Sequence, residues 1–384
     1  MAEIKSFKVM DILEKANEME DIIHLEIGEP DFDTPIEIKN EGIRAIKEEK
    51  IGYTHSMGKK ELREAIAMYY NKKYGTNLKY KNVVVSAGTS PALLLAVYTA
   101  MEFSGKNEIL VSNPGYACYP NFIKFLNGKV SYYELSSEDG FSINIEKIKE
   151  KITDRTAAIL INSPGNPTGV VLKKKDYMEL AELGITIISD EIYQGLVYEG
   201  KQYDTILNYT VNAIALNGFS KLFAMTGWRL GYLIIPDRYI MLTQKLEQNL
   251  FISANTISQY AAIEALTNEN VDKQINNMVK EYNKRRLFAL AEIKKWGLKV
   301  AANPLGAYYI IIDVREYTNN SLIFAYKTLE KARVAVTPGI DFGTNLEGFI
   351  RISYAVSIEN LEEGIKRLGE YLQNEKKIGK ETRR

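Results

Sequence analysis

Five clusters of polar residues each follow an apolar, β-branched run, and together they carry an amine, a carboxylate, an amide and several hydroxyl groups. In an open α/β sheet, ligands bind at the carboxyl ends of the strands. The clusters therefore predict that a ligand site lies along one edge of a sheet. They span Ser86–Ser90, Asn113–Tyr116, Asn162–Gly169, Ser189–Tyr193 and Asn217–Lys221.

The segment Gly88-Thr89-Ser90 lies between an apolar run and a helical pattern. Backbone N–H groups at a helix N-terminus, together with the helix dipole, favour an anion such as a phosphate. Capping of the helix by the Thr89 or Ser90 hydroxyl is the alternative interpretation. The segment does not match GxGxxG, which counts against a dinucleotide-binding fold.

Turn-forming residues are concentrated at Asn162–Gly169, and turn chemistry alone explains most of that pattern. It does not explain two X-Pro steps placed directly after a buried strand. A cis bond at such a step can direct Asn166 inward, toward a ligand. From the residues alone, a plain turn and a ligand-binding amide both remain open.

Asp190 ends the apolar run Ile185–Ser189. Its carboxylate can cap the segment that follows. Alternatively, it is an ionised acid at the sheet edge, which burial permits only beside a cation. Tyr193 follows three residues later, so in a helical turn it faces the same side and reaches the same ligand.

Three basic side chains are candidates for catalysis or anion binding. Lys221 follows an Asn-Gly pair that ordinarily marks a hairpin turn, and a surface lysine is the alternative. Arg229 lies between two glycines and beside a tryptophan, which suits bidentate binding of phosphate or carboxylate. Arg351 lies in an apolar strand pattern, where a solvent-facing position is the alternative to a ligand contact.

Strand-like runs and helical patterns alternate through the middle of the chain. This alternation predicts an α/β fold with a mostly parallel, seven-stranded sheet covered by helices on both faces. Helices are expected at Pro91–Met101 and Lys173–Leu183. The expected strands are Val83–Ser86, Ile109–Ser112, Val130–Glu134, Ala157–Asn162, Thr186–Asp190, Ala213–Asn217 and Leu230–Ile235.

A long helix is predicted for Asp272–Trp296, where no Gly or Pro interrupts the helical spacing of apolar residues. It leads into a smaller α+β unit with strands expected at Ala307–Asp313, Arg333–Thr337 and Phe349–Tyr354. We expect an N-terminal segment (1–44) that joins the small domain, a large domain (45–284) and a C-terminal small domain (285–384). Lys376–Arg384 is expected to be a frayed, solvated tail rather than a nucleic-acid-binding arm.

Composition limits the classes of function. The 384 residues include 49 Lys and Arg and 49 Asp and Glu, so no global charge attracts nucleic acid or a membrane. Cys118 is the only cysteine and His24 and His55 are the only histidines, which excludes an intrachain disulfide and Cys- or His-rich metal sites. No signal-peptide pattern or membrane-length apolar run is present, so a cytoplasmic protein is expected.

The order of the motifs adds a resemblance that no single motif carries. From about residue 20 to 370, the chain resembles the class I/II aminotransferases of the fold-type I pyridoxal-phosphate (PLP) enzymes. Within them it is most similar to the subgroup that includes prokaryotic aspartate aminotransferases. The matching motifs are Gly28–Pro35, Tyr53-Thr54, Asn113–Tyr116, Asn166–Gly169, Ser189–Tyr193, Ser220-Lys221 with Gly227–Tyr232, and Arg351–Tyr354.

The resemblance implies a role for each residue around the cofactor ring. Lys221 would bond covalently to PLP and move the proton between the substrate Cα and the cofactor. Asp190 would pair with the pyridine nitrogen, and a buried carboxylate there keeps that nitrogen protonated so that the ring can accept charge. Tyr193 and Asn166 would hold the 3-oxygen of the ring, and Tyr116 would stack on it.

The resemblance also implies the anion sites. Arg229, the amides of Gly88 and Thr89, and Ser90 would bind the cofactor phosphate. Tyr53 would reach the phosphate of the other subunit in a homodimer with shared active sites. Arg351 would bind the substrate α-carboxylate, with Gly28, Tyr116 and Asn166 also contacting the substrate.

Two positions depart from the family pattern. Many relatives carry a phosphate-binding serine three residues before the lysine, whereas this chain has Gly218. Ser220 would partly replace it, or phosphate binding would depend on Thr89 and Ser90. No residue is identified that would read the side-chain carboxylate of aspartate.

The expected activity is a ping-pong transfer of an amino group from an L-amino acid to a 2-oxo acid. Aspartate or another common amino acid is the expected donor, and 2-oxoglutarate the expected acceptor. An aromatic amino acid or alanine aminotransferase, and a PLP-dependent lyase on the same fold, are the alternatives. The missing GxGxxG opposes a nicotinamide-dependent oxidoreductase. The intact lysine, aspartate and pair of arginines oppose a non-catalytic regulator.

Overall fold

A computed structural model describes residues 4–381 of the chain. Its largest sheet has seven strands in the spatial order β2-β8-β7-β6-β5-β3-β4. The strands are β2 (Val83–Ser86), β3 (Glu108–Asn113), β4 (Lys129–Glu134), β5 (Thr156–Asn162), β6 (Thr186–Asp190), β7 (Ala213–Gly218) and β8 (Gly231–Ile234). All seven predicted strands are confirmed, with ends that differ by at most one residue.

The direction of these strands decides where a ligand can bind. Only β8 runs antiparallel to its neighbours, β7 and β2, and the other pairs are parallel. The carboxyl ends of β2, β3, β5, β6 and β7 therefore share one edge of the sheet. This edge brings the five polar clusters together.

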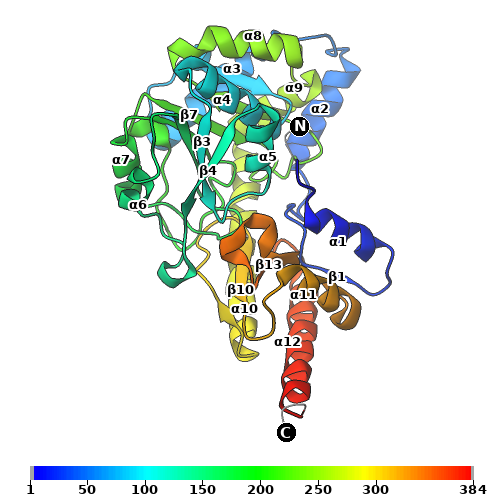
Figure 1. Ribbon diagram of the computed structural model, residues 1–384. Coiled ribbons are helices and arrows are strands. Elements are labelled where there is room, and N and C mark those ends of the chain that lie inside the picture. The colour runs from blue at the N-terminus through cyan, green and yellow to red at the C-terminus, as the bar shows by residue number, and fades with distance from the viewer. Residues whose placement is uncertain (1–3, 382–384) are drawn as a thin grey trace.

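Helices surround this sheet and a second, smaller group of strands (Figure 1). They are α1 (Lys8–Asn17), α2 (Ile36–Lys47), α3 (Lys60–Tyr74), α4 (Thr89–Ser104), α5 (Cys118–Phe125), α6 (Ile145–Lys149), α7 (Lys174–Ala181), α8 (Ile240–Leu250), α9 (Thr256–Thr267), α10 (Glu269–Lys295), α11 (Ser321–Lys327) and α12 (Ile358–Glu381). The predicted long helix is confirmed as α10. It runs through the proposed boundary at residues 284 and 285, and the domain limits stay a prediction.

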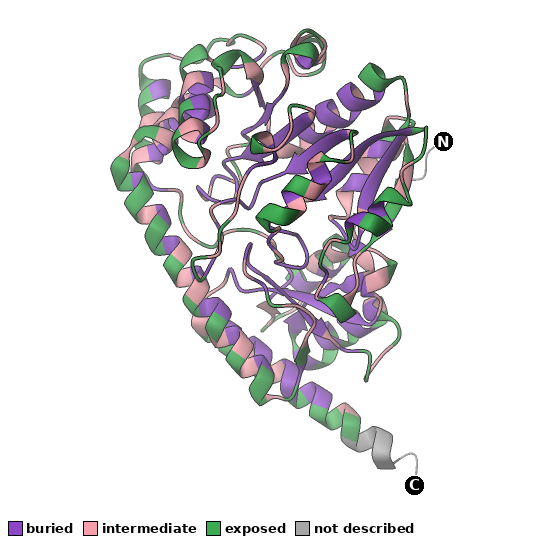
Figure 2. Cartoon of the chain, turned by 90° about the vertical axis from the view of Figure 1, so that its left-hand side faces the viewer, coloured by how far each residue is buried: buried purple, intermediate pink, exposed green. Residues whose placement is uncertain are grey.

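Two hydrophobic clusters fill the space on the two faces of the large sheet. Along β2, Val83 and Val85 belong to one cluster and Val84 belongs to the other, as the alternation of side chains in a strand requires. Every residue of β6 is buried, as expected for a parallel strand covered on both faces. Figure 2 shows the same pattern, with buried strands in the interior and exposed residues on the outer faces of helices.

The remaining strands form two small sheets. A four-stranded antiparallel sheet has the order β12-β13-β10-β9, and β1 pairs with β11 in a parallel, two-stranded sheet. Their bounds are β1 (Ile23–His24), β9 (Lys299–Val300), β10 (Tyr309–Asp313), β11 (Val334–Ala335), β12 (Thr337–Pro338) and β13 (Phe349–Ser353).

The prediction of one continuous strand at Arg333–Thr337 is wrong. Arg333 has a left-handed backbone with φ of 58°, and the residues after it form β11 and β12 in different sheets. The reason is a distant partner. The N-terminal strand β1 pairs with the first half of the segment, and β13 pairs with the second half.

The C-terminal helix also differs from the expectation. The prediction of a frayed tail from Lys376 is wrong as far as Glu381, because α12 continues to that residue, and residues 382–384 lie outside the described part. Leu361, Ile365 and Leu368 bury one face of α12. Extending a helix that has already formed is much easier than starting one.

Within residues 4–381, no helix combines the length and apolar character needed to cross a bilayer.

Candidate active site

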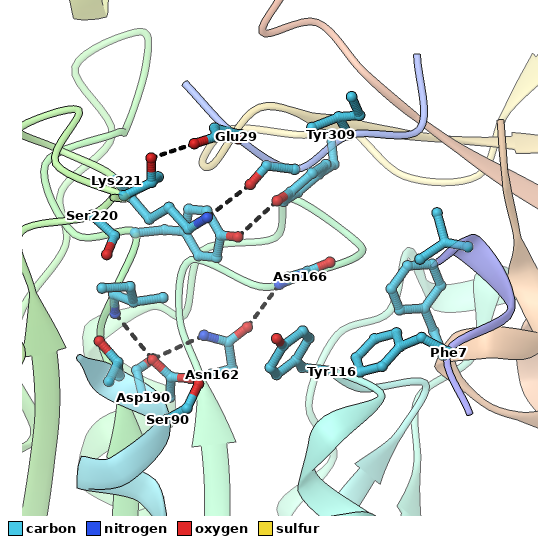
Figure 3. A pocket seen from close by; sticks show the side chains of 18 of the residues that line it. Phe7, Glu29, Ser90, Tyr116, Asn162, Asn166, Asp190, Ser220, Lys221 and Tyr309 are labelled. Atoms are coloured by element: carbon cyan, nitrogen blue, oxygen red, sulfur yellow. Dashed lines mark hydrogen bonds between the residues drawn. The ribbon is translucent and has the colours of Figure 1, made fainter. Parts of the chain in front are cut away.

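A cavity of about 540 Å³ lies at the shared edge of the large sheet and is closed on its other side by residues of β10, β13 and α1. Figure 3 shows Lys221 and Tyr309 on one side of it, Asp190 and Asn162 on the opposite side, and Phe7 beside Tyr116 at one end. Ten of the twelve predicted site residues line this cavity: Gly28, Thr89, Ser90, Tyr116, Asn166, Asp190, Tyr193, Lys221, Arg229 and Arg351.

Lys221 follows β7 and directs its amine into the cavity, so the surface interpretation of this lysine is wrong. Its Nζ donates to the carbonyl oxygen of Gly28 at 2.7 Å. Burial lowers the pKa of Lys221 to about 8; the charge of Glu29 opposes this change, and the positive charges of Arg351 and Arg229 add to it. A substantial neutral fraction near neutral pH makes this amine competent as a nucleophile and a base.

Asp190 ends β6 and is almost completely buried. The Tyr119 hydroxyl donates to Oδ2 at 2.8 Å, and the Ile192 N–H donates to Oδ1 at 3.1 Å. Burial raises the pKa of Asp190 to about 6, although these two hydrogen bonds oppose that effect. The capping interpretation is therefore confirmed. The carboxylate is also buried, and a neighbouring cation would stabilise its charged form.

The N-terminus of α4 has no side-chain cap, so the capping interpretation of Thr89 and Ser90 is wrong. Thr89 Oγ1 is buried and has no hydrogen-bond partner among the described residues. The Gly88 N–H already donates to the Ser86 carbonyl at 2.8 Å, and Gly88 does not line the cavity. A buried hydroxyl without a partner at a helix N-terminus fits an anion such as phosphate.

Arg229 completes the positive end of this site. It has a left-handed backbone with φ of 51°, and its Nη1 donates to the Thr226 carbonyl at 2.9 Å. A Cβ atom built on Gly88 would lie 2.6 Å from Arg229 Nη2. Glycine at position 88, with φ of 105°, therefore lets the guanidinium lie against the start of α4.

Gly218 has a structural explanation of the same kind. A Cβ atom on this residue would lie 2.7 Å from Thr89 Oγ1. The Thr89 hydroxyl thus occupies space next to the position where many aminotransferases carry a serine. Ser220 is buried and also lines the cavity.

Arg351 on β13 is only 5 % exposed, so the solvent-facing interpretation is wrong. Its Nη1 donates to Asn166 Oδ1 at 2.9 Å, and its Nη2 donates to the Glu26 carbonyl at 2.7 Å and to Thr337 Oγ1 at 3.1 Å. Its Nε is buried without a partner among the described residues. The guanidinium is therefore fixed in the cavity by three of its five N–H groups, and its Nε–H is free for an anion.

Asn166 lies in the cavity because the loop after β5 is fixed locally. The Asn166 N–H donates to Asn162 Oδ1 at 2.7 Å, and Asn162 Nδ2 donates to the Asp190 carbonyl at 2.9 Å. The peptide bonds Ser163-Pro164 and Asn166-Pro167 are both cis. The prediction that Asn166 points inward agrees with this placement.

Several lining residues carry no sequence motif. Phe7, Val9, Met10 and Leu13 come from the start of the chain, and α1 is held there by Asp341. The Asp341 carboxylate accepts the backbone N–H groups of Lys8 and Val9 at 3.0 and 2.7 Å. These contacts join residues more than 330 positions apart, and no local pattern could have indicated them.

Tyr53, in contrast, lies outside the cavity and is 85 % exposed. A single chain does not bring it to the site.

Within the part of the chain that the structure describes, no group of three His, Cys, Asp or Glu side chains is placed to hold a metal ion. Three features of the cavity instead suit an organic ligand. It offers an anion site at the start of α4, a carboxylate suited to a heterocyclic N–H, and a nucleophilic amine for a carbonyl carbon. PLP has a phosphate, a pyridine nitrogen and an aldehyde, so the residues present fit this cofactor.

Comparison with known families decides the assignment. The family model described as "Aminotransferase class I and II" matches residues 20–368. The chain belongs to the class I and II aminotransferases. It is a PLP-dependent transaminase, as the resemblance of its motifs implied.

Individual relatives of this aminotransferase cover nearly the whole chain. It is 46 % identical to a (5-formylfuran-3-yl)methyl phosphate transaminase of Methanocaldococcus jannaschii, across 96 % of this chain and 97 % of the relative. It is 39 % identical to an aspartate aminotransferase of Pyrococcus horikoshii, across 97 % and 96 % of the two chains. The solved structure of the Thermus thermophilus aspartate aminotransferase with maleate is similar, with a TM-score of 0.90, 34 % identity, and 96 % and 97 % of the chains covered.

The burial of Asp190 predicts that this residue lowers the stability of the cofactor-free protein, although it favours the binding of PLP. The pKa of Asp190 is about 6 in the fold and near 3.9 in an unfolded chain, so the folded protein binds more protons between these values. Stability therefore falls, relative to a neutral residue, as pH rises through this window. In protein freed of PLP, Asp190→Asn should raise the free energy of unfolding at pH 8 by about 2–3 kcal/mol, measured by urea denaturation.

The gain should shrink at pH 5, where the wild-type carboxyl is largely protonated. The same variant should bind PLP more weakly. A cofactor-free Asp190→Asn protein that is less stable than wild type at pH 8 would contradict this account of the acid.

Proposed function

We propose that this aminotransferase uses Lys221 as its catalytic base and Arg351 as the site for the substrate's anionic group. The observation that supports the proposal is one cavity holding a lysine with a pKa of about 8, a buried carboxylate and a fixed guanidinium. When bound, PLP supplies an aldehyde that takes up the amino group and a ring that stabilises negative charge on the substrate Cα.

The cofactor would be held at three points. The phosphate would lie at the start of α4, where Thr89 Oγ1 lacks a partner and Arg229 and Ser90 face the cavity. A protonated pyridine nitrogen would give Asp190 the cation that its burial requires. Tyr193 and Asn166 would bind the 3-oxygen, and the Tyr116 ring would cover one face.

Lys221 would take the proton from the substrate Cα and return it to the cofactor side. Its pKa, near the working pH, lets it lose and regain a proton with little cost in either state. The hydrogen bond to the Gly28 carbonyl holds the amine on one side of the cavity. A positioned base contributes about 10²–10⁴-fold to the rate.

Arg351 would fix the orientation of the substrate. Its guanidinium centre lies 4.2 Å from the centroid of the Tyr309 ring and 4.8 Å from that of Phe342. These rings and the bond to Asn166 restrict its plane, and a planar fork matches either a carboxylate or a phosphate. Holding the substrate by its anionic group leaves the Cα–H bond free to align with Lys221.

The lining of the cavity favours a substrate with a flat, apolar body. The basic residues that line the cavity are Lys221, Arg229 and Arg351, and no further one among the described residues is left to read a second carboxylate. Phe7, Met10 and Leu13 supply apolar surface instead. Together with the 46 % identical relative, this favours (5-formylfuran-3-yl)methyl phosphate as the acceptor, with its phosphate at Arg351. Aspartate with 2-oxoglutarate, the pair expected from the sequence, is the second candidate, favoured by the Pyrococcus horikoshii relative.

We further propose that two copies of the chain form the active enzyme. Tyr53 is 85 % exposed, and three isoleucines near it in sequence, Ile43, Ile46 and Ile51, are 49–63 % exposed. Exposed aliphatic side chains around an exposed tyrosine suit contact with a second subunit. The Tyr53 hydroxyl would then reach the cofactor phosphate of the partner.

The role of Lys221 is tested by covalent attachment of PLP. Borohydride reduction should fix PLP to wild-type protein and to the control Lys175→Ala, whose side chain is 78 % exposed. Lys221→Ala should retain no reducible PLP and should lose about 10²–10⁴-fold in kcat, since the base is gone. Equal PLP labelling and full turnover of Lys221→Ala would rule out this assignment.

The substrate assignment is tested by following each half-reaction in the visible spectrum. An amino acid donor should convert the cofactor to its amine form. (5-Formylfuran-3-yl)methyl phosphate should then reverse the change with a kcat/KM at least about tenfold above that of 2-oxoglutarate, equivalent to about 1.4 kcal/mol. The opposite order would assign the enzyme to 2-oxoglutarate. Product release without conversion of the cofactor would indicate a lyase.

The dimer is tested by sedimentation equilibrium, which should give twice the chain mass of 43.6 kDa. Because it removes one hydrogen bond to the phosphate, Tyr53→Phe should raise the Kd for PLP about two- to tenfold. A fully active species of 43.6 kDa would exclude shared sites.

A further inference from the structure

Tyr309 contacts two of the proposed site residues, Tyr193 and Arg351, although no motif identifies it. It begins β10, where it pairs with Ser353 of β13, while Ile311 pairs with Arg351. Tyr309 and Arg351 are therefore diagonal neighbours on one face of the small sheet, a separation that aromatic and long side chains can bridge. Both residues are almost completely buried, at 1 % and 5 % exposure.

The Tyr309 ring lies against the guanidinium of Arg351, with 4.2 Å between the guanidinium centre and the ring centroid. A cation on a ring face gains more when both groups are shielded from water. The Arg351 Nη1 and Nη2 atoms bond to Asn166, Glu26 and Thr337. The ring thus supports the plane of a guanidinium that these hydrogen bonds orient.

The hydroxyl at the other end of Tyr309 lies 2.7 Å from the hydroxyl of Tyr193. Figure 3 shows Tyr309 on the same side of the cavity as Lys221. A Cβ atom on Gly28 would lie 2.5 Å from Tyr309 Oη, so the absence of a side chain at Gly28 leaves room for this hydroxyl. The contact joins β10 to the turn that follows β6.

The contact has two possible directions, because either hydroxyl oxygen can be the donor. Each phenol has one proton, so only one of the two can donate within the pair. When Tyr309 donates, the single proton of Tyr193 remains available for an oxygen of the bound ligand. A hydrogen bond received by Tyr193 also polarises its own O–H, which strengthens its donation.

We propose that Tyr309 is a positioning residue for both ends of the site: its hydroxyl directs the Tyr193 proton toward the cofactor, and its ring holds the Arg351 guanidinium in place for the substrate anion. The inference rests on the proposed function for the roles of Tyr193 and Arg351. A purely structural role would not need the hydroxyl. The next three residues of β10 are isoleucines, and in such an apolar strand phenylalanine would fill nearly the same space as tyrosine.

Two substitutions separate the two effects, and a third is the control. Tyr309→Phe removes the hydroxyl but keeps the ring, and Tyr309→Leu removes both. The control is Tyr133→Phe, which removes a buried hydroxyl that donates to the Leu160 carbonyl at 3.2 Å, outside the cavity. If the leucine variant does not fold, Tyr309→Met replaces it.

Each variant is measured in three ways besides turnover. The Kd for PLP and the absorption maximum of bound PLP at a fixed pH report the interaction of Tyr193 with the cofactor. 3-Phenylpropionate is an unreactive carboxylate with an apolar body. Its Kd in the PLP-bound enzyme reports how well Arg351 binds an anion. Thermal unfolding reports any general loss of structure.

Tyr309→Phe should raise the Kd for PLP about two- to tenfold and shift the absorption maximum, with an unchanged Kd for 3-phenylpropionate. Tyr309→Leu should show the same changes and also raise the Kd for 3-phenylpropionate about two- to thirtyfold, since the support of Arg351 is lost. Tyr133→Phe should leave both Kd values and the spectrum as in wild type.

A Tyr309→Phe enzyme with wild-type PLP affinity and spectrum would overturn the role of the hydroxyl. A leucine or methionine variant with wild-type affinity for 3-phenylpropionate would overturn the role of the ring. Failure of the proposed function is distinguishable, because the wild-type enzyme would then show no Lys221-bound PLP and no spectral response to amino acids.

Discussion

The site depends on the burial of an amine and a carboxylate that do not neutralise each other. Asp190 ends β6, and Lys221 follows the neighbouring strand β7. The ion pairs among the described residues do not include one between them. Burial therefore shifts both pKa values toward neutrality, to about 8 for the lysine and about 6 for the aspartate. A direct pair would have stabilised both charges and left neither group free for a ligand.

The surroundings of these two groups show how the fold keeps them apart. The Gly28 carbonyl binds the lysine amine from one side, and the Tyr119 hydroxyl binds the carboxylate from the other. Gly28 comes from the N-terminal part of the chain and Tyr119 from α5. Neutral partners thus offset part of the free-energy cost of burying these groups. A charged ligand can add to that stabilisation without displacing an ion pair.

The sequence could predict the large sheet because its information is local. The strands β5 and β6 are continuous apolar runs ended by polar residues, and parallel strands place such ends at one edge. Asp190, Asn166 and Lys221 were found in this way. Motif order then identified Arg229, which is exposed, and Arg351, whose burial no local pattern could settle.

The features that could not be predicted from the sequence depend on contacts between distant residues. The break in Arg333–Thr337 arises from pairing with β1, and the apolar wall of the cavity depends on Asp341 binding the start of α1. Tyr309 looked like one more residue of a buried strand, and only its tertiary neighbours, Tyr193 and Arg351, distinguish it. Thr89 resembled a helix cap, and its role depends on the space beside Gly218.

The attachment of α1 to Asp341 has a practical consequence for handling the enzyme. Phe7 and Val9 form part of the cavity wall, so the segment at the start of α1 is a component of the candidate active site. An affinity tag fused next to this segment would alter the surface that the proposed substrate contacts. A tag for purification is therefore better placed away from α1.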